Sequence, residues 1–160
     1  GQEIRHLLLH RKGDVAPRAE ALLYAADRAH HVATKILPAL DKGVVVLSDR
    51  YYDSSVAYQG AARELSVTEV QEISLWAVAG LEPDLTFLLD LPAEQALARR
   101  DDTGTEPDRL ESEKVDFFAR ARQQYLELST EPRFEVIDAS LSVDQIHEAV
   151  IARVKAFGLK

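Results

Sequence analysis

The sequence contains no cysteine and no methionine. A chain without cysteine forms neither disulfides nor thiolate metal sites. It also has no stretch of about 18 apolar residues, the length that a membrane-spanning helix needs, and its first residues lack the long apolar core of a signal peptide. These absences are consistent with a cytoplasmic protein that has no membrane partner.

Basic residues are comparatively few, because 19 lysines and arginines face 27 acidic residues and give a net charge of −8. Extended nucleic-acid or anionic-membrane binding requires a basic surface, so we expect neither partner. A small anionic substrate remains compatible with this charge, since a pocket needs only a few arginines. The 160 residues, 46% of them hydrophobic, suffice to bury the core of one globular domain.

Three short apolar runs occur at residues 44–48, 85–91 and 134–139. The first two are apolar at consecutive positions, which is typical of strands covered on both faces in a parallel sheet. Helical patterns lie around these runs, so the sequence predicts an α/β fold with a parallel sheet flanked by helices. The predicted helices cover residues 18–40, 53–60, 67–80, 93–100, 110–129 and 143–157.

The longest predicted helix, residues 18–40, begins after Pro17, which suits a first helical position. Pro38 is expected to bend or end its last turn. At roughly 100° per residue, Tyr24 and Arg28 lie on the side opposite an apolar stripe. That stripe consists of Leu22, Ala26, Ala29, Ala33, Ile36 and Leu40.

Asp49 and Arg50 follow the first apolar run, where the carboxyl end of a parallel strand places ligands. An apolar run that ends in aspartate is similar to the Walker B arrangement, in which the carboxylate helps to hold Mg²⁺ near phosphates. The planar fork of Arg50 suits a phosphate. The alternative is a purely structural Asp–Arg pair at a strand end.

Ser54 and Ser55, with Tyr58 and Gln59, extend this candidate site. A helix that starts near residue 53 places Ser55, Tyr58 and Gln59 on one face, where a hydroxyl, a phenol and an amide can meet one ligand. Gly60 is predicted to end that helix. The alternative is a serine-capped turn with a half-buried tyrosine.

Tyr24 and Arg28 stand one helical turn apart and can supply an aromatic plate and a hydrogen-bond donor for a flat base. The alternative is a surface or interface tyrosine beside a solvated arginine. Arg99, Arg100 and Arg109 surround a polar, turn-rich stretch, which reads either as a solvated loop or as a closing loop that delivers arginine to a transferred phosphate. The five histidines have no metal-ligand spacing.

Four segments together resemble the thymidylate kinase family over nearly the whole chain. "DRYYDSSVAYQGAARE" resembles its signature, "EALLYAADR" its substrate helix, "GLEPDLTFLLDLPAE" its next strand, and "PDRLESEKVDFFARARQQYLEL" its LID and the following helix. The resemblance implies a P-loop kinase fold, a single nucleoside monophosphate kinase domain over residues 1–160, and a LID at about 99–110. It also implies a homodimer that uses Mg²⁺ to transfer the γ-phosphoryl group of ATP to thymidine monophosphate (dTMP), giving dTDP for dTTP synthesis.

The resemblance also implies roles for the residues that would bind the nucleoside. Tyr24, where the family usually has phenylalanine, would stack on thymine, and Arg28 would bond its carbonyl oxygen. Ser55 and Gln59 would contact the base, and Tyr58 would pack on the sugar.

A second group of residues would bind the phosphates and Mg²⁺. Arg50 would hold the acceptor phosphate and Asp49 would organise Mg²⁺ through water. Arg99 is the expected catalytic LID arginine and Arg109 lies nearer ATP. Asp101 and Asp102 depart from the arginine-rich LID of many bacterial members, which leaves the identity of the catalytic arginine open.

No "GxxxxGK[ST]" motif occurs in the chain. The first strand and the P-loop are therefore expected to precede Gly1, and the chain as given is expected to be inactive because the ATP phosphates lack their cradle. Two alternatives remain open. One is a kinase for another nucleoside or deoxynucleoside monophosphate, and the other is a non-catalytic nucleotide-binding or dimerisation module.

Overall fold

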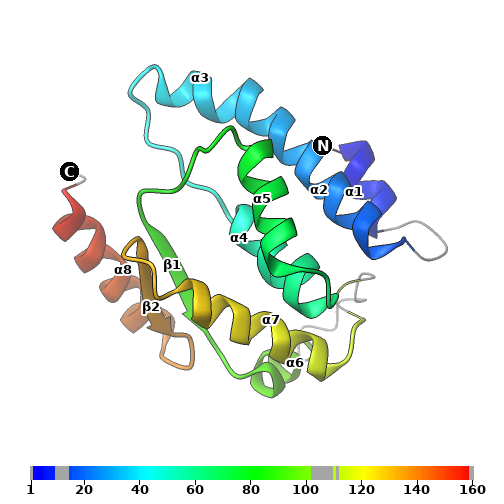
Figure 1. The fold of residues 1–160 in the computed structure, drawn as a ribbon. Coiled ribbons are helices and arrows are strands. Elements are labelled where there is room, and N and C mark those ends of the chain that lie inside the picture. Colours follow the sequence, from blue (N-terminus) through cyan, green and yellow to red (C-terminus); the bar gives the residue numbers. More distant parts are fainter. Residues whose placement is uncertain (1, 10–14, 102–109, 111, 159–160) are drawn as a thin grey trace.

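The computed structural model describes residues 2–9, 15–101, 110 and 112–158, and shows helices around a small sheet (Figure 1). Strands β1 (Thr86–Asp90) and β2 (Phe134–Asp138) are parallel, in a register that pairs Thr86 with Phe134 and Asp90 with Asp138. The helices between them, α6 (Ala93–Asp101) and α7 (Val115–Leu128), form the crossover that a parallel pair requires. The predicted strands at 85–91 and 134–139 are thereby confirmed.

The predicted strand at 44–48 is wrong for this structure, because the segment is not part of the sheet. It runs from the long helix down to α4 (Tyr52–Ser55) without strand pairing, and its side chains are largely exposed, Leu47 by 93%. A strand forms only where a neighbour pairs its backbone N–H and C=O groups. The described residues supply no neighbour here, although the composition suits the interior of a sheet.

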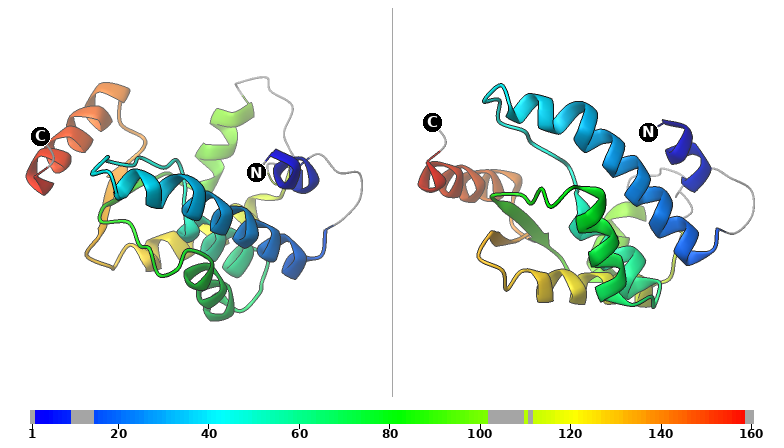
Figure 2. Two further views of the ribbon diagram at one scale, coloured as in Figure 1. Left: turned by 90° about the horizontal axis from the view of Figure 1, so that it is seen from above. Right: turned by 45° about the horizontal axis from the view of Figure 1, so that its top comes forward.

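The longest helix is continuous over α2 (Pro17–His31), a π-helical segment η1 (Val32–Ile36) and α3 (Leu37–Leu40) (Figure 2). The predicted range of 18–40 is confirmed, and Pro38 does not end the helix early. The π-helical segment comes just before this proline, and the N–H of Leu37 donates to the C=O of Val32, five residues back. Proline cannot donate such a bond, so the wider turn accommodates it.

The apolar stripe of this helix is largely exposed: Leu22 is 55% and Leu40 39% accessible. The side chains that face the interior are instead Ala21, Ala25 and Val32, together with Ile36 from the stripe. The core-facing side of the helix is therefore rotated toward the side that carries Tyr24 and Arg28.

Gly60 does not end its helix, contrary to the prediction. The chain passes from α4 directly into the π-helical segment η2 (Val56–Ala62), and Gly60 lies within it. A Cβ atom at this position would lie 3.3 Å from the Cα of Val67, at the start of α5 (Val67–Ala77). Glycine is used here for close helix packing rather than for termination.

The remaining helices agree with the sequence to within a few residues at their ends. Helix α5 ends at Ala77 rather than near residue 80, and α7 begins at Val115 rather than at 110. Helix α8 (Val143–Phe157) matches its predicted range, and Ser142 and Gln145 form the full capping box at its start. Helix α1 (Gln2–Leu9) was not predicted. None of the described helices is long and apolar enough to cross a lipid bilayer.

Two apolar clusters hold α4 and η2 against the rest of the molecule. The first joins Tyr52 and Val56 to the long helix, α7 and β2. The second joins Ala57 and Ala62 to Phe117 on α7. Helix α8 lies beside β2 at the end of the molecule that carries the C-terminus (Figures 1 and 2). The segment from Asp49 to Ala62 is therefore held between α2, α5 and α7.

Candidate active site

Arg50 lies in a tight turn between the extended segment and α4. Its φ is 64°, in the left-handed region that side chains other than glycine rarely adopt. The hydroxyl of Ser48 donates to the C=O of Arg50 over 2.7 Å and supports the turn. The guanidinium carbon lies 5.2 Å from the ring centroid of Tyr58. Arg50 is exposed, so the turn holds an accessible cation over an aromatic ring.

Aromatic hydroxyl groups surround this cation. Burial acts to lower the pKa of Arg50, but the neighbouring phenols and Asp49 raise it overall. The phenols are those of Tyr58, Tyr125 and Tyr24. Tyr24 on α2 and Tyr58 on η2 thus both act electrostatically on Arg50.

Arg28 joins the long helix to the serine pair. Its Nη1 donates to the Oγ of Ser55 over 3.0 Å, and its guanidinium carbon lies 6.0 Å from the ring centroid of Tyr51. Burial lowers the pKa of Arg28, although arginine remains a cation in proteins. The alternative of a solvated arginine is therefore wrong. No side chain caps α4, so the serine cap of the other alternative is wrong, whereas its half-buried tyrosine, Tyr58, is confirmed.

Gln59 is held by a fully buried carboxylate. Its Nε2 donates to the Oε1 of Glu20 over 2.9 Å, and Glu20 is 0% exposed. The Nε of Arg63 lies 3.4 Å from the same oxygen, and Arg63 also bonds Glu113. Because a carboxylate only accepts hydrogen bonds, the amide nitrogen of Gln59 must face Glu20. The amide oxygen of Gln59 is left as the acceptor for a ligand.

Tyr125 on α7 completes the aromatic group. Its ring centroid lies 6.1 Å from that of Tyr58, edge to face. The hydroxyl groups of Tyr125 and Ser54 lie 2.7 Å apart. Burial raises the pKa of Tyr125 to about 12, so its hydroxyl stays protonated at neutral pH.

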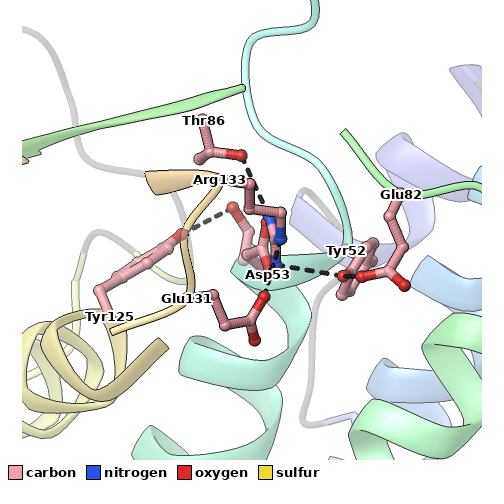
Figure 3. Close-up of polar contacts among 8 residues, drawn as sticks. Tyr52, Asp53, Glu82, Thr86, Tyr125, Glu131 and Arg133 are labelled. Atoms are coloured by element: carbon pink, nitrogen blue, oxygen red, sulfur yellow. Dashed lines mark hydrogen bonds and ion pairs between the residues drawn. The ribbon is translucent and has the colours of Figure 1, made fainter. Parts of the chain in front are cut away.

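Asp53 ties this segment to the sheet through Arg133 (Figure 3). Nη2 of Arg133 donates to Oδ1 of Asp53 over 2.7 Å, and Nη1 donates to Oδ2 over 2.9 Å. Nη1 also donates to the hydroxyl of Thr86, the first residue of β1. A bidentate arginine–carboxylate pair fixes orientation as well as distance.

Asp49 is exposed at the start of the turn. Among the described residues no hydrogen bond or ion pair joins it to Arg50, although its charge raises the pKa of that arginine, so both readings of the Asp–Arg pair stay open. Within residues 2–9, 15–101, 110 and 112–158, no group of three or more histidine or acidic side chains could hold a metal ion. A single free carboxylate nevertheless fits Mg²⁺, which commonly binds through one or two carboxylates, water and substrate phosphates.

Of the predicted ATP-side arginines, the structure describes Arg99, which donates a hydrogen bond to a residue outside this group. Arg99 on α6 donates from Nη1 to the C=O of Ala139, just after β2, over 2.8 Å. Arg109 and most of the predicted LID at 99–110 lie outside the described residues.

A cavity of about 180 Å³ lies at the carboxyl end of β1, where Tyr58 of η2 lines it. Its walls include Tyr58 and Tyr125 together with Asp90, whose carboxylate pairs bidentately with Arg122 over 2.7 and 2.9 Å. Hydrogen bonds from Arg122 lower the pKa of Asp90. Parallel α/β proteins bind ligands outside the carboxyl ends of their strands, and this cavity has that position.

Sequence reasoning missed several residues that shape the site. Glu20 precedes Tyr24 and Arg28 at intervals of four, so helical spacing places all three on one face and could have indicated it. The remaining missed residues are Arg63, Tyr125, Asp53 and Arg133. Their partners lie far away along the chain, and no local pattern reveals such pairs.

The family model for thymidylate kinase matches residues 1–150. A thymidylate kinase of Leifsonia xyli subsp. xyli is 60% identical over 155 residues, covering 96% of this chain and 74% of the relative. One from Clavibacter michiganensis subsp. michiganensis is 58% identical, covering 98% and 75%. One from Halothermothrix orenii is 46% identical, covering 100% and 78%.

The two parallel strands with their helical crossover define the class, an α/β protein. Within that class, the chain belongs to the thymidylate kinase family. The predicted function, that of a thymidylate kinase, is thereby confirmed.

Proposed function

We propose that the protein transfers the γ-phosphoryl group of ATP to dTMP with the help of Mg²⁺, and that residues 49–59 and α2 form the acceptor half of its site. The observation that carries this assignment is the hydrogen bond between Arg28 and Ser55. It joins the helix expected to hold the base to the segment expected to hold the phosphate. Family membership supports the same reading.

The base and sugar would bind between α2 and η2. Tyr24 would stack on thymine, and Arg28 would donate to a carbonyl oxygen of the base. Ser55 and Gln59 would contact its edge. The orientation of Gln59 supports this role, because its amide oxygen can accept from the N3–H of thymine whereas cytosine has no proton there. Tyr58 would pack on the sugar.

The acceptor phosphate would bind Arg50. An arginine presented over an aromatic ring, and accessible from solvent, suits bidentate recognition of phosphate. In phosphoryl transfer the protein acts mainly by positioning and by neutralising charge. Asp49 would hold Mg²⁺ through water, and the metal would neutralise phosphate charge. Arg99 would exchange its bond to Ala139 for a phosphate contact, and Arg109 would act on the ATP side.

A homodimer is part of this proposal, as is a single kinase domain with a LID at about 99–110. The exposed apolar face of the long helix supports the dimer. Leu22, Leu37 and Leu40 are accessible by 55%, 37% and 39%, and burying such a face against a second copy is favourable. Light scattering coupled to size exclusion, on wild type and Leu22→Asp, tests it. A monomeric wild type would contradict it.

Substrate competition tests the proposed function. The full-length protein should phosphorylate dTMP with ATP and Mg²⁺, and in mixtures it should prefer dTMP to uridine, cytidine and deoxycytidine monophosphates. Product analysis by anion-exchange chromatography separates the diphosphates. Faster turnover of a uridine or cytidine nucleotide would show that the substrate assignment is wrong. Absence of ATP-dependent turnover with every nucleotide would favour a binding module.

A further inference from the structure

Arg133 uses every N–H donor of its guanidinium. Besides Asp53 and Thr86, Nη2 donates to the hydroxyl of Tyr52 over 3.1 Å and Nε donates to Glu131 over 2.8 Å (Figure 3). Tyr52 in turn donates to Glu82 over 2.9 Å. The group is largely removed from water, since the side chains of Arg133 and Asp53 are 10% and 6% exposed. A buried cation with all donors satisfied defines one geometry.

This cluster connects three elements at their starts. Arg133 directly precedes β2, Thr86 begins β1, and the N–H of Thr86 donates to the C=O of Arg133 over 2.7 Å. Tyr52 and Asp53 form the first turn of α4. The guanidinium therefore fixes the first turn of α4 relative to the sheet. Burial opposes its charge, but the bonds and charge of Asp53 raise the pKa of Arg133.

The first turn of α4 follows Arg50 after a single residue. Arg50 has a φ of 64°, a conformation that costs free energy in a residue with a side chain and persists only where the surroundings impose it. The bond from Ser48 supports the turn from before Arg50. Asp53 and Tyr52, held by Arg133, fix the chain that follows it.

We propose that Arg133 is a positioning residue for phosphoryl transfer, which acts through Asp53 and Tyr52 to hold Arg50 in its strained, phosphate-facing conformation. The inference rests on the proposed function, because it takes Arg50 as the acceptor-phosphate ligand. Arg133 itself does not touch the substrate. Lysine cannot replace it, since one ammonium group offers three donors and no planar fork.

A double-mutant cycle in the full-length protein tests this proposal. Arg133→Lys should lower kcat/KM for dTMP by about 10-fold or more and leave KM for ATP within about twofold, the scale set by loss of one oriented charge contact. In an Arg50→Ala background the same change should cost less than about twofold, because it acts through a side chain that is already gone. As a control, Arg153→Gln on α8 removes an arginine–carboxylate pair with Glu135 on β2 and should leave both parameters unchanged.

Each variant is assayed well below its own melting temperature, with the folded fraction checked by circular dichroism. Asp53→Asn, which keeps shape but loses the charge, provides a second variant and should show the same pattern. Equal losses in the wild-type and Arg50→Ala backgrounds would overturn the proposal, as would unchanged dTMP kinetics in a folded Arg133→Lys. If wild type prefers another nucleoside monophosphate, the proposed substrate fails and the cycle is measured on that nucleotide.

Discussion

The hydroxyl groups of Ser54 and Tyr125 lie 2.7 Å apart and join α4 to α7. This bond and the adjacent edge-to-face contact of Tyr125 with Tyr58 hold α4 and η2 against α7. Both hydroxyls are removed from bulk water. Removing either hydroxyl group should therefore lower the free energy of unfolding by a measurable amount.

Tyr125→Phe should lower the free energy of unfolding by about 1 kcal/mol, because it leaves the Ser54 hydroxyl without its partner. Urea denaturation measures the change. Tyr51→Phe is the matched control, since the Tyr51 hydroxyl is buried and has no hydrogen-bond partner in the described part of the chain. Removing that hydroxyl should be neutral or stabilising. A larger loss from Tyr51→Phe than from Tyr125→Phe would contradict the assignment.

The stability of the protein at alkaline pH should depend on the buried phenol of Tyr125. Its pKa is raised to about 12 in the folded protein, whereas an unfolded tyrosine titrates near 10. The contribution of the neutral phenol is thus complete below about pH 10 and is lost as the pH rises toward 12. Between these values the stability of wild type should fall more steeply than that of Tyr125→Phe, by up to about 1.4 kcal/mol per pH unit. Parallel slopes would mean that the phenol is not desolvated.

Glu20→Gln should cost about 2 kcal/mol or more, because it removes a buried charge that holds Arg63 and Gln59. Arg63 keeps its contact with Glu113, which limits the loss. Glu69→Gln is the control, since its ion pair with Arg18 is exposed and worth little. Denaturation midpoints of the two variants are compared. Equal losses of stability in Glu20→Gln and Glu69→Gln would contradict the prediction that the buried charge contributes more than the exposed one.

Gly60→Val should destabilise the protein by about 1–3 kcal/mol, the usual cost of overpacking. The Cβ of the new side chain would lie 3.3 Å from the Cα of Val67. This neighbour is a backbone atom, so a change of side-chain rotamer cannot relieve the close contact. Ala152→Val, on the exposed side of α8, is the control and should change stability little. Thermal unfolding distinguishes the two. A wild-type melting temperature for Gly60→Val would show that α5 can move away.

Arg50→Ala should reduce kcat/KM for dTMP by roughly 10²-fold or more, the scale of losing a charge-assisted phosphate contact worth a few kcal/mol. The full-length enzyme is used, and Arg18→Ala on the exposed face of α2 serves as the control with unchanged kinetics. Near-wild-type turnover by Arg50→Ala would refute the role of Arg50.

Elements with a strong local signal could be predicted from the sequence. The capping box at Ser142 and Gln145 fixed the start of α8 to the residue, because that pattern acts within a single turn. Helical spacing predicts that Ser55 and Gln59 face the same way, and their roles in the site stay predictions. Family resemblance then gave these residues their expected roles.

What could not be predicted depends on partners that are distant in the chain. Residues 44–48 have the composition of a buried strand, but composition does not reveal whether a neighbour pairs with it. Gly60 fits both a helix end and a helix contact, and only the position of Val67 decides between them. In the sequence, Arg133 is one charged residue before a strand, and only the structure shows that it pairs with Asp53.

Eighty positions separate Asp53 from Arg133 along the chain. Contacts between such distant positions close a long loop and cannot form until intervening structure has assembled. Arg133 sits where β1 and β2 begin, so the two strands must align before the carboxylate meets its partner. If Arg133 holds Arg50 as proposed, the turn at Arg50 is expected to reach its final conformation only after β1 and β2 have paired.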